Sequence, residues 1–232
     1  MSFSSNRLRL ARKRNRLTSA ALARKSGLTP VTISRLERTN NDPGPKTVKA
    51  LAEALGYPIS FFYEEEMEEV EKDQASFRSL KSMTAKDRDA SLAAASIAFL
   101  ISDWVDAHFS LPDVDIPPMG SELSAPSEAA MRLRTHWGLG LRPIGNMIDL
   151  LEAKGVRVFS LAENSLRVDA FSCWRGEVPY VFLNTRKSAE RSRFDAAHEL
   201  AHLCLHGRSG ARSNTAEAEA DAFAASFLMP EK

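Results

Sequence analysis

The sequence has few cysteines and no apolar run long enough to span a bilayer. Cys173 and Cys204 are the only cysteines among 232 residues, too few for a disulfide framework. The most apolar stretch, residues 91–105, falls short of the roughly 20 residues of a transmembrane helix, which predicts a buried helix. Residues 1–16 are polar and basic, so we expect no secretory signal. These shortages favour a reduced, cytoplasmic protein without a membrane partner.

Acidic residues are scarce in the first part of the chain. Residues 1–62 hold 12 lysines and arginines against 3 acidic residues, whereas residues 63–232 hold 19 against 27. The net charge of +1 for the whole chain conceals this division. A basic excess confined to one segment indicates a polyanionic partner.

The basic segment carries the signals of several short helices. Gly27 and Gly56 are placed to end two of them, and Pro30 stands at the first position of another, where helix starts favour proline. Two short helices joined by a glycine-containing turn are typical of a helix-turn-helix, whose second helix enters the major groove of DNA. The predicted helices cover residues 7–16, 19–25, 30–38 and 46–55.

The motifs RLAR, SGLT, TISRLER and LAEALG follow one another in this segment, starting at residues 9, 26, 32 and 51. They resemble the XRE-type, Cro/repressor-like DNA-binding family, although Ser19 stands where the family often has glutamine. The resemblance implies double-stranded DNA as a partner and is compatible with a homodimer on paired half-sites. A basic bundle that binds protein is the alternative. The resemblance implies contacts to base edges or nearby phosphates from Thr29, Pro30, Val31, Thr32 and Arg35, and contacts to the DNA backbone from Arg9 and Arg38.

Six glutamates follow the basic segment, at positions 64, 65, 66, 68, 69 and 71. Such a run is usually a solvated linker or helix face, and the alternative is that it screens the DNA-binding surface. A helix is predicted over residues 87–107, and a proline-rich linker over residues 111–126. We therefore predict a DNA-binding domain at residues 1–63, a connecting region at 64–126 and a second domain at 127–232.

The second domain mixes helical and strand signals. Helices are predicted over residues 128–137 and 143–154, and a further helix begins at Ser188. A mainly α helix-turn-helix bundle followed by an α+β domain with a small sheet is the expected fold class. The strand candidates, rich in valine and aromatic residues, are residues 156–161, 168–174 and 179–184.

Three of the five histidines lie in one stretch, HELAHLCLH, from His198 to His206. Residues four apart share one face of a helix, so His198 and His202 can present two imidazoles to one metal ion. Neutral imidazole is a preferred zinc ligand, and a catalytic zinc keeps one position open for water. Glu199 can take a proton from that water and pass it to a leaving amine, as in metalloproteases. Histidines packed on an apolar helix face are the alternative.

A second helix, predicted from Thr215 to Pro230, offers further ligands. Glu217 and Asp221 are again four residues apart, so we predict that Glu217 completes the zinc site and that Asp221 orients a ligand histidine. Glu219 is the rival ligand, but it lies about 200° around the helix from both and should face away if Asp221 faces the site. A solvated helix face is the alternative for all three carboxylates.

We do not expect His206 to bind the metal. It lies about 12 Å from His198 on a straight helix, too far for easy joint ligation. Because Gly207 follows it, we place His206 at the end of the helix, near the last carbonyl groups.

The motifs IDLLE, GVRV, FSCW, FLN, RFDAAHELAH and FLMP, together with the Glu217/Asp221 pair, resemble the ImmA/IrrE family of metallopeptidases, a zincin-like group. The resemblance covers roughly residues 129–231, with Ala201 where glycine is common and Asp221 where asparagine is common. It implies His198, His202 and Glu217 as zinc ligands, Glu199 as the base, and a repressor-like protein as substrate. By analogy with zincins, a free edge of the strand at residues 180–184 is expected to hold the substrate peptide.

The sequence therefore predicts a cytoplasmic DNA-binding transcriptional regulator with a Zn²⁺-dependent endopeptidase domain. One alternative is a regulator whose zincin domain is a non-proteolytic metal or ligand sensor or a partner-binding module. Another is an antitoxin-like DNA binder of a two-gene module. Manganese or another divalent ion is an alternative occupant of the metal site.

Overall fold

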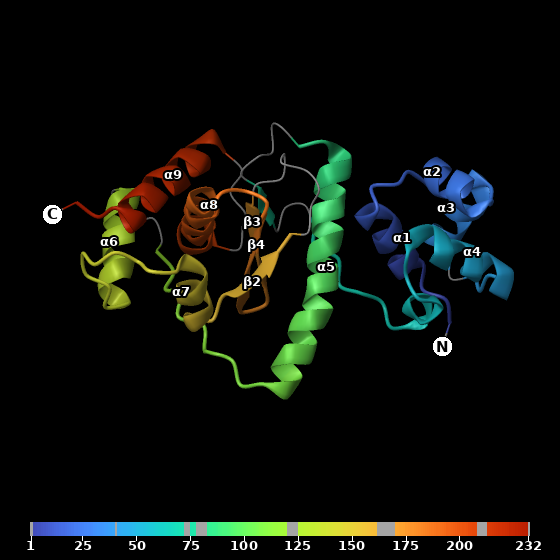
Figure 1. The fold of residues 1–232 in the computed structure, drawn as a ribbon, viewed down its shortest axis with the longest axis horizontal. Coiled ribbons are helices and arrows are strands. Elements are labelled where there is room, and N and C mark those ends of the chain that lie inside the picture. Colours follow the sequence, from blue (N-terminus) through green and yellow to red (C-terminus); the bar gives the residue numbers. More distant parts are fainter. Residues whose placement is uncertain are drawn as a thin grey trace. The chain divides into compact units, whose positions relative to one another are not determined.

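The computed structural model describes residues 2–39, 41–71, 75–77, 83–119, 125–161, 170–207 and 213–231. The chain folds into two compact units, coloured by sequence in Figure 1. Helix α5 (Ala85–His108) contributes residues to both. The first unit comprises Met1–Val70 and Met83–Ile101, and the second comprises Glu71–Ser82 and Ser102–Lys232.

Short helices build the first unit, and side-chain caps determine where they begin. The hydroxyl oxygens of Thr18 and Thr29 each accept a hydrogen bond of 3.1 Å from the backbone N–H three residues further on. Gly27 ends the second helix with a φ of 68°, a left-handed conformation that favours glycine. The elements are α1 (Ser5–Arg14), α2 (Ser19–Ser26), α3 (Pro30–Arg38), α4 (Pro45–Leu55) and the 3-10 helix η1 (Ile59–Tyr63).

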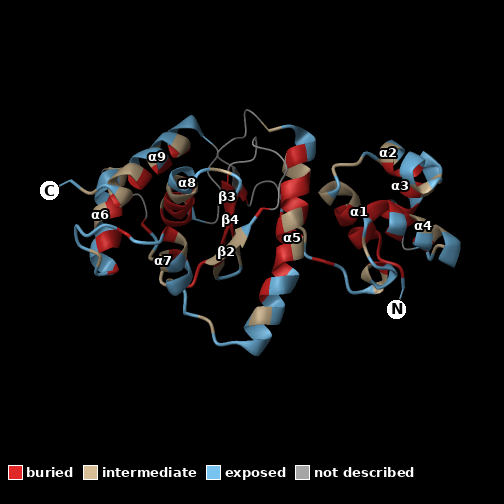
Figure 2. Cartoon of the chain, in the orientation of Figure 1, coloured by how far each residue is buried: buried red, intermediate tan, exposed pale blue. Residues whose placement is uncertain are grey.

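One apolar core holds these helices together, seen as buried segments facing inward in Figure 2. Burial of each such side chain stabilises the fold by about 2 kcal/mol before entropic costs. The core fixes α3 against α2 and leaves the start of α3 open to solvent. Its fully buried members include Leu8, Leu22, Ile33, Leu51 and Phe62.

The second unit contains a four-stranded sheet in the order β1-β3-β4-β2. The strands are β1 (Ala75–Phe77), β2 (Arg157–Ser160), β3 (Ala170–Arg175) and β4 (Val178–Leu183). β3 and β4 form an antiparallel hairpin, β2 runs parallel to β4, and β1 runs antiparallel to β3.

The prediction of a free edge at residues 180–184 is wrong. β4 is an inner strand, because β3 pairs with one side of it and β2 pairs with the other. An inner strand has no unpaired row of backbone groups to offer a peptide. The outer neighbour of β3 is β1, a strand that the sequence analysis missed.

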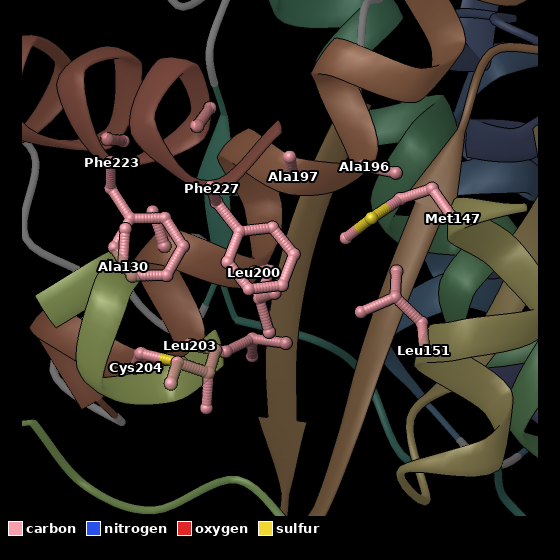
Figure 3. Close-up of a cluster of buried hydrophobic side chains, with 14 of the residues drawn as sticks. Ala130, Met147, Leu151, Ala196, Ala197, Leu200, Leu203, Cys204, Phe223 and Phe227 are labelled. Atoms are coloured by element: carbon pink, nitrogen blue, oxygen red, sulfur yellow. The ribbon is translucent and has the colours of Figure 1, made fainter. Parts of the chain in front are cut away.

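Helices pack against one another beside the sheet. The bounds are α6 (Pro126–His136), α7 (Met147–Ala153), α8 (Ala189–Ala201), a π-helix labelled η2 (His202–His206) and α9 (Asn214–Leu228). Leu200 of α8 packs with Phe223 and Phe227 of α9 in the cluster drawn in Figure 3. The predicted fold class, a mainly α bundle and an α+β domain with a small sheet, is confirmed.

Several helix boundaries differ from the sequence prediction by a few residues, and the start of α7 is one of them. α7 begins at Met147 instead of residue 143, because the Asn146 side chain accepts a hydrogen bond of 3.0 Å from the backbone N–H of Ile148 and caps the helix there. The predicted start of the middle strand, Val168, lies outside the described residues.

Among the described helices, α5 alone is long and apolar enough to cross a membrane by length and composition. Half of its most apolar window is buried within the protein. Residues 91–105, predicted to be a buried helix, lie within α5.

Candidate functional sites

Helix α8 carries the two histidines of the HExxH motif into the interior. Ser188 caps the helix by accepting a hydrogen bond of 3.3 Å from the backbone N–H of Arg191. His198 and His202 are almost fully buried, with 0% and 2% exposure. Their Nε2 atoms lie 3.1 Å apart, so both imidazoles point at one place.

A third donor comes from α9, which Ser213 caps through the backbone N–H of Ala216 at 3.0 Å. Glu217 places Oε2 at 3.4 Å from His198 Nε2 and Oε1 at 3.5 Å from His202 Nε2. The three side chains thus form a group able to hold one metal ion, with ligand atoms within 4.8 Å of one another.

The donor set fits zinc. Around a tetrahedral zinc with bonds of about 2.0–2.1 Å, neighbouring ligand atoms are about 3.3 Å apart. The two imidazole Nε2 atoms are 3.1 Å apart, and each lies 3.4 or 3.5 Å from a different oxygen of the Glu217 carboxylate, so the spacing is close to that required. Two imidazoles and one carboxylate leave one position free, which is the ligand set of a hydrolytic zinc centre.

Glu199 lies beside these donors with one oxygen held and the other unpaired. Its Oε2 accepts a hydrogen bond of 2.7 Å from the Ser172 hydroxyl on β3. Its Oε1 is buried and has no hydrogen-bond partner among the described residues. An unpaired buried acceptor is costly in a structural role and is what a base needs to receive a proton from water.

Sequence analysis missed Ser172. Because it lies 27 positions from Glu199 along the chain, helical spacing says nothing about the pair. The only signal in the sequence is a small hydroxyl residue within an otherwise apolar strand, and that residue is 2% exposed.

Burial and neighbouring groups shift the pKa values of the side chains at the candidate metal centre. Burial raises the pKa of Glu217, but hydrogen bonds from His198 and His202 outweigh it and lower this pKa to about 2. Burial lowers the pKa of His202, which favours the neutral, metal-binding imidazole. Burial raises the pKa of Glu199 to about 7, and a divalent cation nearby would act in the opposite direction.

Each histidine also has a partner on its second ring nitrogen. His198 Nδ1 lies 2.9 Å from Asp221 Oδ1, the contact that their helix faces predict. His202 Nδ1 lies 2.9 Å from His206 Nδ1, and His206 Nε2 lies 2.9 Å from Glu219 Oε2. If His202 bound a metal through Nε2, its Nδ1–H would donate to His206, and Nε2–H of His206 would donate to Glu219.

His206 is the last residue of the helix, as predicted, and neither it nor Glu219 belongs to the group of metal donors. The partners of the His206 ring were not predicted, because they are His202 and Glu219 and not the last carbonyl groups. α8 passes into a π-helix over His202–His206, in which the rings of His202 and His206 are neighbours. Glu219 misses the metal donors, and its carboxylate reaches the imidazole of His206 instead.

The start of α3 presents the residues predicted to contact DNA bases. Val31 is 77% exposed, so its side chain is accessible to a partner. Thr29 caps the helix through the backbone N–H of Thr32, which is half-buried. The other predicted base or backbone contacts on this helix, Pro30, Arg35 and Arg38, are exposed.

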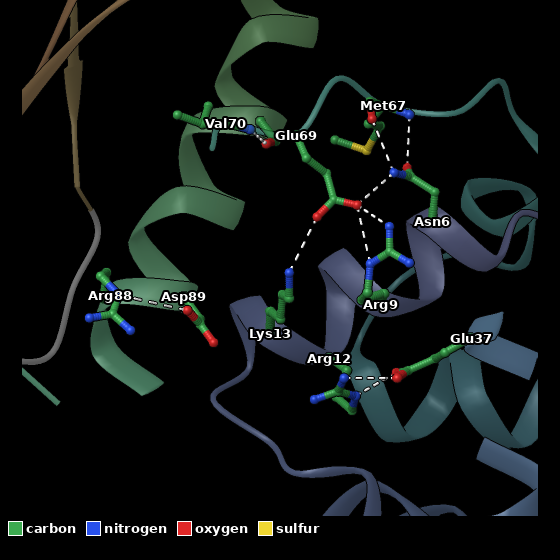
Figure 4. Close-up of polar contacts among 11 residues, drawn as sticks. Asn6, Arg9, Arg12, Lys13, Glu37, Met67, Glu69, Val70, Arg88 and Asp89 are labelled. Atoms are coloured by element: carbon green, nitrogen blue, oxygen red, sulfur yellow. Dashed lines mark hydrogen bonds and ion pairs between the residues drawn. The ribbon is translucent and has the colours of Figure 1, made fainter. Parts of the chain in front are cut away.

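Arg9, predicted to contact the DNA backbone, forms an ion pair with the acidic segment (Figure 4). Its guanidinium pairs with the carboxylate of Glu69, which also lies 3.3 Å from Lys13 Nζ. Asn6 donates a hydrogen bond of 3.0 Å to the same carboxylate and bonds the backbone of Met67 in both directions. Part of the acidic run is therefore ordered on α1.

Comparison with known protein families agrees with both candidate sites, the exposed start of α3 and the candidate metal centre. A helix-turn-helix family model matches residues 8–62, and the model of the IrrE N-terminal-like domain, a peptidase family, matches residues 151–232. The chain joins an XRE-type helix-turn-helix domain to an IrrE N-terminal-like domain. The first domain indicates a DNA-binding regulator and the second a peptidase-like, metal-dependent function. No curated protein matches the chain.

The His206 contact generates a test of metal affinity. We expect His206→Phe, which keeps a ring but removes both nitrogens, to lower zinc affinity by about tenfold or more, because outer hydrogen bonds orient ligand histidines. Competition with a chromophoric chelator measures this affinity. His136→Phe is the control, because His136 is exposed on α6 and bonded to Asp115. Equal affinities in the two variants would contradict a role for His206.

Proposed function

We propose that the protein is a cytoplasmic, DNA-bound transcriptional regulator whose second unit is a zinc-dependent endopeptidase acting on a repressor-like protein. The observation that carries the proposal is the convergence of His198, His202 and Glu217 beside an unpaired oxygen of Glu199. A sensor or structural metal site does not need a buried carboxylate with an unpaired oxygen next to it.

In this proposal His198, His202 and Glu217 hold the zinc, with Asp221 and His206 orienting the two imidazoles. Bound zinc supplies Lewis acidity, which lowers the pKa of a bound water to about 7. Glu199 Oε1 takes a proton from the attacking water and later delivers it to the amide nitrogen as the C–N bond breaks. The Ser172 hydroxyl holds Glu199 Oε2 throughout, so the proton is confined to Oε1.

In this proposal the first unit directs the protein to its DNA site. The start of α3 would enter the major groove, where Val31 suits the methyl group of thymine and Arg35 suits guanine. Because this DNA-binding unit is joined to a peptidase, the peptidase would lie close to other proteins bound at the same DNA. A repressor-like protein is such a protein.

The assignment of the base is tested in cells of the source organism. We expect Glu199→Gln, which keeps size and a hydrogen-bonding oxygen, to retain zinc but lose cleavage, because the amide cannot take a proton. Mass spectrometry of new protein N-termini compares cells that express the wild type with cells that express the variant. New N-termini within helix-turn-helix proteins should depend on Glu199. Identical sets of N-termini would sink the endopeptidase assignment.

The Glu69 pairing leads to a prediction about DNA binding. We expect Glu69→Gln to bind DNA more tightly than the wild type at low salt, because Arg9 and Lys13 become available to phosphate. Each added phosphate contact should steepen the dependence of log K on log salt by about 0.9. Fluorescence anisotropy with duplex DNA measures both. Glu66→Gln makes the same charge change at an exposed position, and an equal gain there would refute the specific effect.

A further inference from the structure

The edge of the sheet beside the candidate metal centre is already occupied by the chain itself. Strand β3 pairs along its whole length with β4 on one side, and with the three residues of β1 on the other. The register sets Ala75 opposite Cys173, Ser76 opposite Ser172 and Phe77 opposite Phe171. β1 is therefore the outermost strand at this end of the sheet.

β3 is also the strand that touches the base. Ser172, in the middle of the β1–β3 register, donates the hydrogen bond of 2.7 Å to Glu199. Residues opposite one another in an antiparallel pair lie about 4.5–5.5 Å apart between Cα atoms. Whatever segment pairs with the outer edge of β3 therefore runs past the residue that holds Glu199.

The segment that contains β1 differs from an ordinary linker in its path. Residues up to Val70 belong to the first unit, Glu71–Ser82 belong to the second, and Met83–Ile101 belong to the first again. The chain thus leaves one unit, adds a strand to the sheet of the other, and returns. A connection that only joined two helices of the first unit would not need this excursion.

The pairing is short enough to be exchanged. β1 covers Phe171, Ser172 and Cys173, whereas β4 pairs with all six residues of β3. An extended peptide of five or six residues could form about twice as many ladder contacts with the same edge. Ala75 is fully buried opposite Cys173, so the edge accepts a small side chain there.

We propose that the outer edge of β3 is the docking edge for an extended peptide of a protein partner, and that β1 is its occupant in cis. A partner peptide docks by replacing β1, with a small residue at the place of Ala75. The assignment of this partner as the peptidase substrate rests on the proposed function, whereas the docking edge itself does not.

The test compares two double variants of the full chain, both with Glu199→Gln so that the probe is not cut. Ser76→Pro with Phe77→Pro removes two neighbouring amides, one of which faces β3 whatever the phase of the ladder. Ser76→Ala with Phe77→Ala keeps both amides. The probe is a fluorescent peptide with the sequence of residues 71–82, and circular dichroism checks that both variants are folded.

We expect the double-proline variant to bind the probe at least about tenfold more tightly than the double-alanine variant, since only the latter keeps β1 on β3. Hydrogen exchange over residues 170–175 should be faster in the double-proline variant without the probe and return to the slower rate with it. Equal affinities, or no binding by the double-proline variant, would overturn the proposal. Binding by the double-proline variant, without hydrolysis once Glu199 is restored, would support the docking edge and count against the endopeptidase assignment.

Discussion

The contact between α8 and α9 is the constraint on which the candidate metal centre depends. The two helices pack within one apolar core, to which Leu200 of α8 and Phe223 and Phe227 of α9 belong. Because the histidines lie on α8 and Glu217 lies on α9, the three donors stay together only while this packing holds the two helices in place.

Local spacing explains why much of the centre could be predicted from sequence. His198 and His202 share a face because helical residues four apart always do, and the same holds for Glu217 and Asp221. The two helices had clear caps and ends. The family resemblance agreed with the three donors that the structure brings together.

The parts of the site that the sequence analysis missed depend on contacts between different helices and strands, which the spacing of residues within one helix cannot show. The bond from Ser172 to Glu199 joins a strand to a distant helix. The contact between His206 and Glu219 likewise joins residues of two different helices, which spacing within one helix cannot predict. β1 has three residues, too few for a strand pattern, and it pairs with the outer side of β3.

The segment after the helix-turn-helix is an active part of both units. Glu69 pairs with Arg9 and Lys13 of α1, and six residues later the same segment begins its ladder with β3. One segment of the chain therefore supplies an ion pair to the first unit and a strand to the second.

Metal content tests the central claim most directly. The purified full-length protein, supplied with zinc and dialysed, should retain one zinc per chain by inductively coupled plasma mass spectrometry. Glu217→Gln should retain much less, because it loses the anionic donor while keeping the size of the side chain. A wild-type protein without zinc, or a Glu217→Gln protein with the full amount, would contradict a metal centre built from His198, His202 and Glu217.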